Sequence, residues 1–108
     1  MRSLSETLTD LIGFAEETIT RPANHYGFMV DQRFTIVSQE VRRADALPAE
    51  GIRTTRAGMI MITALDEFFG GDREATSPWL MLAGTTLPLL RAEAWRAKRN
   101  EQEVRGSS

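Results

Sequence analysis

Cysteine is absent from this chain of 108 residues, which also contains a single histidine and a single tyrosine. Without cysteine the chain forms no disulfide, no thiolate metal site, no iron–sulfur cluster and no cysteine nucleophile. The lone His25 is part of no His-x-x-Glu, Glu-x-x-His or His-Glu-x-x-His spacing, so the ligand sets of metal-binding helical bundles are missing. We therefore expect no metal and no cofactor.

His25 has two interpretations. It is a general base or a ligand if the chain folds so that Glu16, Glu17 or Asp31 comes near it. The favoured interpretation is a polar residue in the first turn of a helix. Tyr26 follows directly, and a small-molecule site with His25 or Tyr26 at its mouth is a further hypothesis.

The chain lacks the other signals that point to enzymes. It contains neither a glycine-rich phosphate loop nor a dinucleotide-binding fingerprint. Its adjacent carboxylates, Glu16-Glu17 and Asp66-Glu67, point about 100° apart on a helix and do not converge on one proton or metal. We expect solvated helix surface at both pairs, and a non-enzymatic protein.

Long apolar runs are also missing. The longest, Gly58–Leu65, is far shorter than the roughly 18–20 residues that span a bilayer. Near the N-terminus, Glu6 and Asp10 interrupt any apolar segment that could follow Arg2 as a secretory signal. The prediction is a cytoplasmic protein with no membrane partner.

The overall composition is that of a globular protein. Hydrophobic residues make up 42% and charged residues 26%, with a net charge of −2 that argues against nucleic acid as the main partner. Lys98 is the only lysine beside twelve arginines, which suits either a GC-rich genome or selection for bidentate contacts. We expect one domain over 1–105 and a disordered tail at 106–108.

Apolar residues recur every three or four positions, which is the period of an α-helix with one buried face. Such stripes predict an all-α fold, a four-helix up-down bundle with helices at about 4–20, 24–46, 53–69 and 78–100. Ser3 or Ser5, Asn24 and Ser77 are the expected N-caps. The stripes are Leu4, Leu8, Leu11, Ala15 and Ile19; Tyr26, Val30, Phe34, Val37, Val41 and Ala44; and Leu80, Ala83, Leu87, Leu90, Ala94 and Ala97.

Pro88 interrupts the last stripe. It removes one backbone hydrogen bond and clashes with the carbonyl of Gly84 in a regular helix. The chain there either kinks and continues or breaks, with Thr86 capping a separate final helix. Because the stripe keeps its phase across Pro88, we favour the kinked, continuous helix.

The helix at 53–69 is apolar on every side, which is typical of a helix buried on more than one face. A bundle of this size has little protein to surround such a helix, so we predict self-association as a homodimer or larger oligomer. The second edge of the helix at 24–46, with Phe28, Met29 and Ile36, is an alternative contact. The residues expected to meet a second copy are Met59, Ile60, Ile62 and Phe69.

Trp95 is the most suggestive single residue, because Arg91 and Arg99 lie four residues to either side and Arg96 is adjacent. An exposed tryptophan ringed by guanidinium groups is typical of a protein-binding hot spot. It also suits stacking on nucleic-acid bases, or a structural tryptophan covered by arginine stems. We expect partner binding at Trp95, Arg91, Arg96 and Arg99, in a regulatory or adaptor protein.

The main alternative function is a nucleic-acid-binding regulator. Arg42, Arg43, Arg53 and Arg56 flank one predicted turn, although a solvated bundle end is favoured over a phosphate clamp there.

The stretch Ala64–Asp72, followed by Trp79-Leu80, Gly84 and Pro88-Leu89, loosely resembles the toxin-binding C-terminal domain of Xre/ParS-type antitoxins. That resemblance covers about a quarter of the chain and implies an antitoxin-like transcriptional regulator. Trp79 and Gly84 stand closer together than in that pattern, the first two helices carry no helix-turn-helix signal, and no functional residue is carried over.

Overall fold

The computed structural model consists of four α-helices. They are α1 (Leu4–Thr20), α2 (Gly27–Ala46), α3 (Arg56–Gly70) and α4 (Pro78–Gly106). The structure describes residues 3–21, 27–46, 56–71, 74 and 76–106, and no strand occurs among them. The all-α prediction is confirmed. The predicted starts at 24–26 and 53–55, Asn24 as a cap and residues 107–108 of the tail lie outside the described residues.

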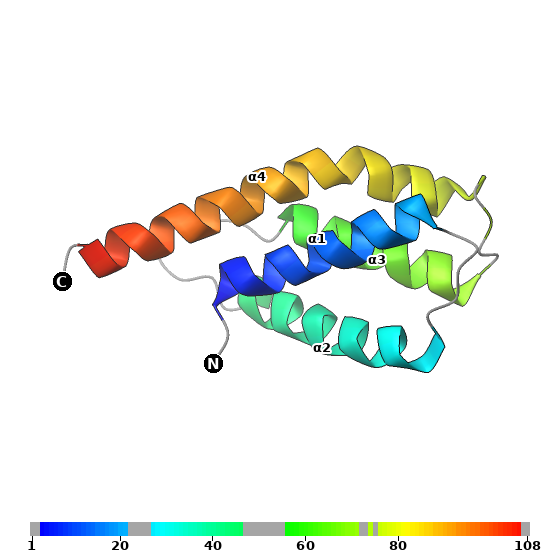
Figure 1. Cartoon of the computed structure of the whole chain (residues 1–108), viewed down its shortest axis with the longest axis horizontal. Coiled ribbons are helices and arrows are strands. Elements are labelled where there is room, and N and C mark those ends of the chain that lie inside the picture. Colours follow the sequence, from blue (N-terminus) through cyan, green and yellow to red (C-terminus); the bar gives the residue numbers. More distant parts are fainter. Residues whose placement is uncertain (1–2, 22–26, 47–55, 72–73, 75, 107–108) are drawn as a thin grey trace.

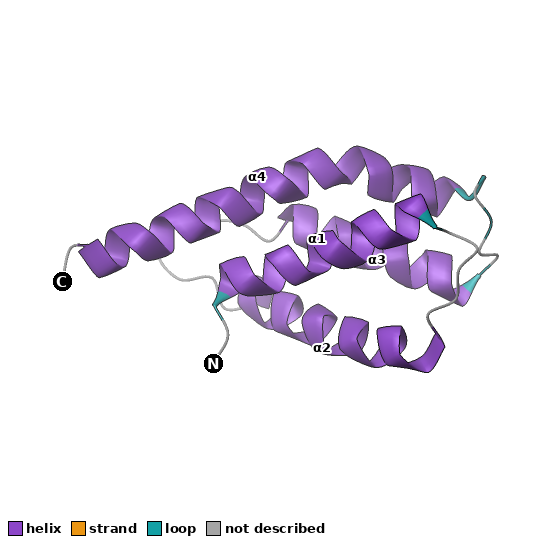
Figure 2. Cartoon of the chain, viewed as in Figure 1, coloured by secondary structure: helices purple, strands orange, loops and turns teal. Residues whose placement is uncertain are grey.

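The helices alternate in direction along an elongated bundle measuring 48 × 25 × 21 Å (Figures 1 and 2). α4 packs most extensively on α1 and α3, whereas α2 packs on α1 and α3 and not on α4. Figure 1 shows that α1 and α3 start at the same end of the bundle and that α4 finishes at that end. The predicted up-down architecture is confirmed.

The predicted stripes form the core. Leu8, Leu11 and Ala15 of α1 are fully buried, and Leu4 and Ile19 pack at the edges of the same cluster. The remaining stripe residues that are buried are Phe34, Val37 and Val41 of α2, and Leu80, Ala83, Leu90, Ala94 and Ala97 of α4. Burying each large aliphatic side chain contributes about 1.5–3 kcal/mol, so these stripes hold the bundle together.

A glycine allows α3 to approach its neighbours closely. A Cβ atom on Gly58 would lie 3.2 Å from a methyl carbon of Leu8 and 3.2 Å from one of Val41. Around this contact α3 touches all three other helices. This arrangement buries most of the apolar residues of α3 and leaves one face exposed, on which Arg56, Ile60, Thr63 and Glu67 lie.

Two helix starts follow the predicted capping. The Ser3 hydroxyl accepts a hydrogen bond from the Glu6 backbone N–H at 3.3 Å. At the start of α4, the Ser77 hydroxyl accepts the Trp79 N–H at 3.3 Å, and Pro78 is the first helical residue. Both caps satisfy amide groups that have no partner within the helix itself.

The helix α4 runs continuously through Pro88 and its axis bends in its yellow-to-gold section (Figure 1), as the favoured alternative predicts. Its predicted end near Asn100 is wrong, because the helix continues to Gly106. The last turns are held by Glu101, which bonds to α1, and by an ion pair of 3.3 Å between Arg99 and Glu103. Gly106 is therefore helical and not part of a tail.

Candidate interaction surface on the last helix

The side of α4 that points away from α1 and α3 carries a row of exposed uncharged residues. Met81 is 68% exposed, Leu89 60% and Trp95 60%. We call this row the outer face of α4, and it comprises Met81, Leu82, Thr85, Pro88, Leu89, Ala92 and Trp95. Within the part of the chain whose side chains are described, the other large exposed apolar residues are Trp79 at the start of α4, Ile36 on α2 and Ile60 on α3.

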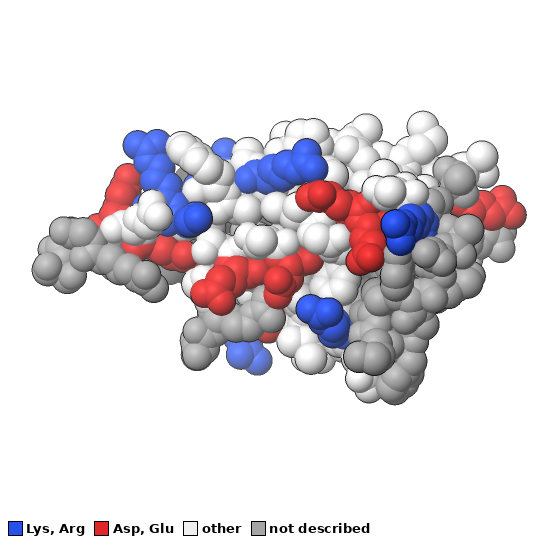
Figure 3. All heavy atoms as spheres, in the orientation of Figure 1, with Lys and Arg blue, Asp and Glu red and all other residues white. Residues whose placement is uncertain are grey.

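Charge divides α4 into two halves. No charged residue lies between Glu74 and Arg91, whereas the part after Leu90 is rich in arginine. Figure 3 shows uncharged atoms along the edge formed by the first half of α4, and basic side chains toward its C-terminal half. The surface therefore combines an apolar area with an adjoining basic one.

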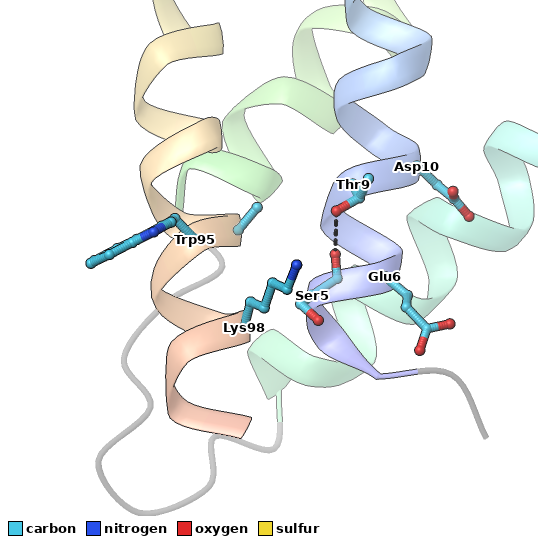
Figure 4. Close-up of a pocket in the computed structure, with 7 residues that line it drawn as sticks. Ser5, Glu6, Thr9, Asp10, Trp95 and Lys98 are labelled. Carbon is cyan, nitrogen blue, oxygen red and sulfur yellow. Dashed lines mark hydrogen bonds between the residues drawn. The ribbon is translucent and has the colours of Figure 1, made fainter. Parts of the chain in front are cut away.

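Trp95 lies at the junction of the two halves. Its ring points away from α1 in Figure 4, and the Arg99 guanidinium carbon lies 5.4 Å from the ring centroid. A cation–π contact of this kind contributes about 0.5–1 kcal/mol at an exposed site. The contact orients both groups while leaving most of the indole surface accessible.

Arg91 and Arg99 also form exposed ion pairs. Arg91 lies 3.4 Å from Glu16 of α1, and Arg99 lies 3.3 Å from Glu103. Exposed pairs contribute about 0–1 kcal/mol each, so an incoming carboxylate can replace either partner at little cost. Arg96 is exposed between them.

Two glutamates of the same region are turned inward. The Glu93 carboxylate accepts the backbone N–H groups of Ala57 at 3.1 Å and Gly58 at 3.0 Å, and its residue is only 4% exposed. Burial raises the pKa of Glu93, while the two amide hydrogen bonds and the charge of Arg96 oppose the rise. Glu93 thus caps the first turn of α3.

Glu101 caps α1 in the same way. One carboxylate oxygen accepts the Ser5 backbone N–H at 3.1 Å, and the other accepts the Ser5 hydroxyl at 2.6 Å. Both glutamates are thus turned inward toward α1 and α3, and Glu93 interacts in addition with the charge of Arg96. Among the described side chains of this part of α4, the exposed basic ones are Arg91, Arg96, Lys98 and Arg99.

A groove of about 590 Å³ lies between α1 and α4 (Figure 4). Lys98 reaches across it toward Ser5, whereas Trp95 points away from it. The residues lining it are Ser5, Glu6, Thr9, Asp10, Ala94, Trp95 and Lys98. Five of its seven lining residues are polar or charged, whereas pockets for small molecules are usually lined by hydrophobic and aromatic side chains.

A second hollow of about 480 Å³ lies at the opposite end, between the end of α3 and the start of α4. Three carboxylates, those of Asp66, Glu67 and Glu74, are among its lining residues. No group of three or more histidine, cysteine or carboxylate residues in the described ranges is placed to hold a metal ion.

The structure places the four residues predicted to meet a second copy mostly in the core of one chain. Ile62 is fully buried, so its prediction as a self-association residue is corrected: α1, α2 and α4 surround α3, and Ile62 has no surface to offer. Met59 and Phe69 are partly buried against the same core, and Phe69 stacks edge-on against Phe34 at 5.6 Å. Ile60 is 37% exposed.

The remaining predicted residues are dispersed. His25, Tyr26 and Arg53 lie outside the described residues, as does the Asp31 side chain. Arg42 forms a 3.3 Å ion pair with Asp66, which reduces the positive charge of the predicted basic end. Arg43 and Arg56 are exposed.

Sequence reasoning singled out Trp95 and its arginines but not the exposure of Met81 and Leu89. A signal was present for Met81, because positions 81, 85, 88, 92 and 95 repeat at four, three, four and three residues and form a second stripe beside the buried one; Leu89 lies next to this stripe and is not part of it. The inward glutamates Glu93 and Glu101 were also missed.

No helix within the described residues is long and apolar enough to cross a membrane. No family model matches the chain, and neither a curated protein nor a solved structure matches it. The resemblance to antitoxin domains thus gains no support from a family match.

Proposed function

We propose that this chain is a small non-enzymatic adaptor or regulator that acts by binding another protein through the outer face of α4. The observation that carries the proposal is the exposure of Met81, Leu89 and Trp95 on one side of a single helix. The core does not require these side chains, since α4 buries a separate stripe against α1 and α3.

The composition of this surface supports the proposal. Tryptophan, methionine and arginine are enriched in protein interfaces, and binding energy is concentrated in a few such residues. Scattered exposed apolar residues are ordinary, but a contiguous row of them marks an interaction site in many proteins. We also propose a cytoplasmic location, which fractionation of the native cells tests.

The experiment is affinity capture from the native source with the wild-type chain and two variants. The double variant Met81→Glu/Leu89→Glu places charges in the middle of the outer face. The control Gln32→Glu/Gln39→Glu introduces the same two charges at exposed residues on α2, away from the outer face. We expect the control to retain the captured proteins and the double variant to lose them. Retention of every partner by the double variant and by Trp95→Ala contradicts the proposal.

Homodimer formation is a second proposal, favoured by the exposure of Ile36 on the second edge of α2. Analytical ultracentrifugation at micromolar concentration tests it. A wild-type dimer that becomes a monomer on Ile36→Glu supports this edge as the contact, whereas a wild-type monomer excludes it.

A further inference from the structure

The two halves of the outer face of α4 define the chemistry of the partner. We propose that the occupant is an acidic amphipathic helix of another protein, lying lengthwise along α4. Its apolar side chains cover Met81 and Leu89, and its carboxylates meet Arg91, Arg96 and Arg99. This inference rests on the proposed function and specifies the partner class for the same surface.

The apolar half suits a helix better than an extended strand. The stripe through positions 81, 85, 88 and 92 leaves a row of side chains at helical spacing, against which a second helix packs with residues at its own three- and four-residue intervals. Met81, in this row, is 68% exposed. Its flexible thioether adapts to different apolar partners.

The basic half determines the sign of the partner's charge. Glu93 is bonded to the amides of α3 and Glu101 to Ser5 of α1, so both carboxylates are turned inward, although the Glu93 charge still interacts with Arg96. The arginines carry exposed pairs with Glu16 at 3.4 Å and Glu103 at 3.3 Å, which acidic groups of a partner can replace. Planar guanidinium groups favour carboxylates because they bind them in a bidentate manner.

A second copy of the chain fits this surface poorly. If two α4 helices pair in parallel, their basic halves face each other and repel. If they pair antiparallel, the arginines of each copy lose water against the uncharged half of the other, which has no carboxylate between Glu74 and Arg91. An acidic helix avoids both costs.

The test uses three synthetic peptides that share one apolar helical face and carry Glu, Gln or Lys at all flanking positions. Binding is followed by fluorescence in a Trp79→Phe background, where Trp95 is the one remaining tryptophan of the two in the sequence. We expect the Glu peptide to bind about tenfold more tightly than the Gln peptide, and the Lys peptide to bind more weakly than both. The affinity of the Glu peptide falls as salt is raised.

A charge exchange gives the decisive comparison. Arg96→Glu/Arg99→Glu is expected to reverse the order and favour the Lys peptide, whereas Arg43→Glu, an exposed arginine on α2, leaves the order unchanged. Circular dichroism confirms that each variant is folded.

Equal affinity for the three peptides, or no binding of the Glu peptide, overturns the inference. Binding to phosphatidylcholine–phosphatidylserine vesicles or to duplex DNA in place of the Glu peptide also overturns it. If the peptides show no charge preference but Met81→Glu/Leu89→Glu still abolishes capture of native partners, the proposed function stands and only the partner class is wrong. If the double variant still captures every native partner, both the proposed function and the inference about the partner class are wrong.

Discussion

The Glu93 carboxylate of α4 accepts the backbone N–H of Gly58 in α3 at 3.0 Å. Together with the bond from Ala57, it satisfies two amides that the first turn of α3 leaves without intrahelical partners. An acidic side chain from a distant helix thus acts as a cap for the first turn of α3. The negative charge also interacts favourably with the positive end of the α3 dipole.

Glu93→Ala is expected to destabilise the bundle by about 2–3 kcal/mol, because it leaves two buried amides without acceptors. Glu103→Ala, an exposed glutamate on the same helix, is the control and is expected to change stability by about 0.5 kcal/mol or less. Urea unfolding followed by circular dichroism measures both. Equal losses for the two variants contradict a capping role for Glu93.

The pH dependence of stability follows from the raised pKa of Glu93. A carboxyl group whose pKa is higher in the folded state binds its proton more tightly there, so folding favours the protonated form. Its contribution to stability is therefore largest below the unfolded pKa and is lost as pH rises through the folded pKa. Glu93→Gln removes this term. We measure the free energy of unfolding of both proteins and subtract the value for Glu93→Gln from that for wild type. This difference is expected to be greater at pH 4 than at pH 7. A difference that increases from pH 4 to pH 7 contradicts the prediction.

The same capping shows where sequence reasoning ends. Periodicity predicted four helices and most of the core, because each stripe depends only on spacing along the chain. Glu101 and Ser5 are 96 positions apart, so no local pattern reveals their contact near the end of α4. Glu93 sits between core residues Leu90 and Ala94, and its partners are backbone amides, which leave no mark in a sequence.

The prediction for α3 is corrected at Ile62 for a related reason. The apolar surplus of α3 suggested a second copy, but Gly58 lets α3 approach Leu8 and Val41 closely, and Ile62 is buried within one chain. Most of the large exposed apolar residues among the described side chains are instead on α4, where Met81 and Leu89 lie beside the longer buried stripe in the sequence.

Gly58→Ala and Gly13→Ala separate helix propensity from packing. Both glycines lie inside helices, where alanine is preferred by about 0.5–1 kcal/mol. A Cβ atom on Gly13 meets nothing within 4 Å, so Gly13→Ala is expected to stabilise the bundle. On Gly58 the added atom presses on Leu8 and Val41, and overpacking of this kind costs about 1–3 kcal/mol. Chemical denaturation is expected to rank Gly58→Ala below Gly13→Ala, and an equal gain for both shows that α3 has room to move.

Glu101→Ala tests how the end of α4 is held. Loss of both bonds to Ser5 is expected to reduce stability by about 1 kcal/mol and to lower amide-exchange protection after Asn100. Protection around Leu90 is expected to persist, because that part of α4 is anchored in the core. Unchanged exchange across the whole helix indicates that helix propensity and the Arg99–Glu103 pair suffice without the cap.

Leu89 and Leu90 are neighbours with opposite environments, 60% and 0% exposed. If the outer face of α4 serves binding and not folding, Leu89→Glu changes unfolding stability by about 0.5 kcal/mol or less, as surface substitutions do. Leu90→Glu buries an unpaired carboxylate in the core and is expected to prevent folding at neutral pH. Thermal unfolding by circular dichroism compares the two directly. A large loss of stability on Leu89→Glu shows that Leu89 supports the fold. Its exposure is then no evidence for a role in binding.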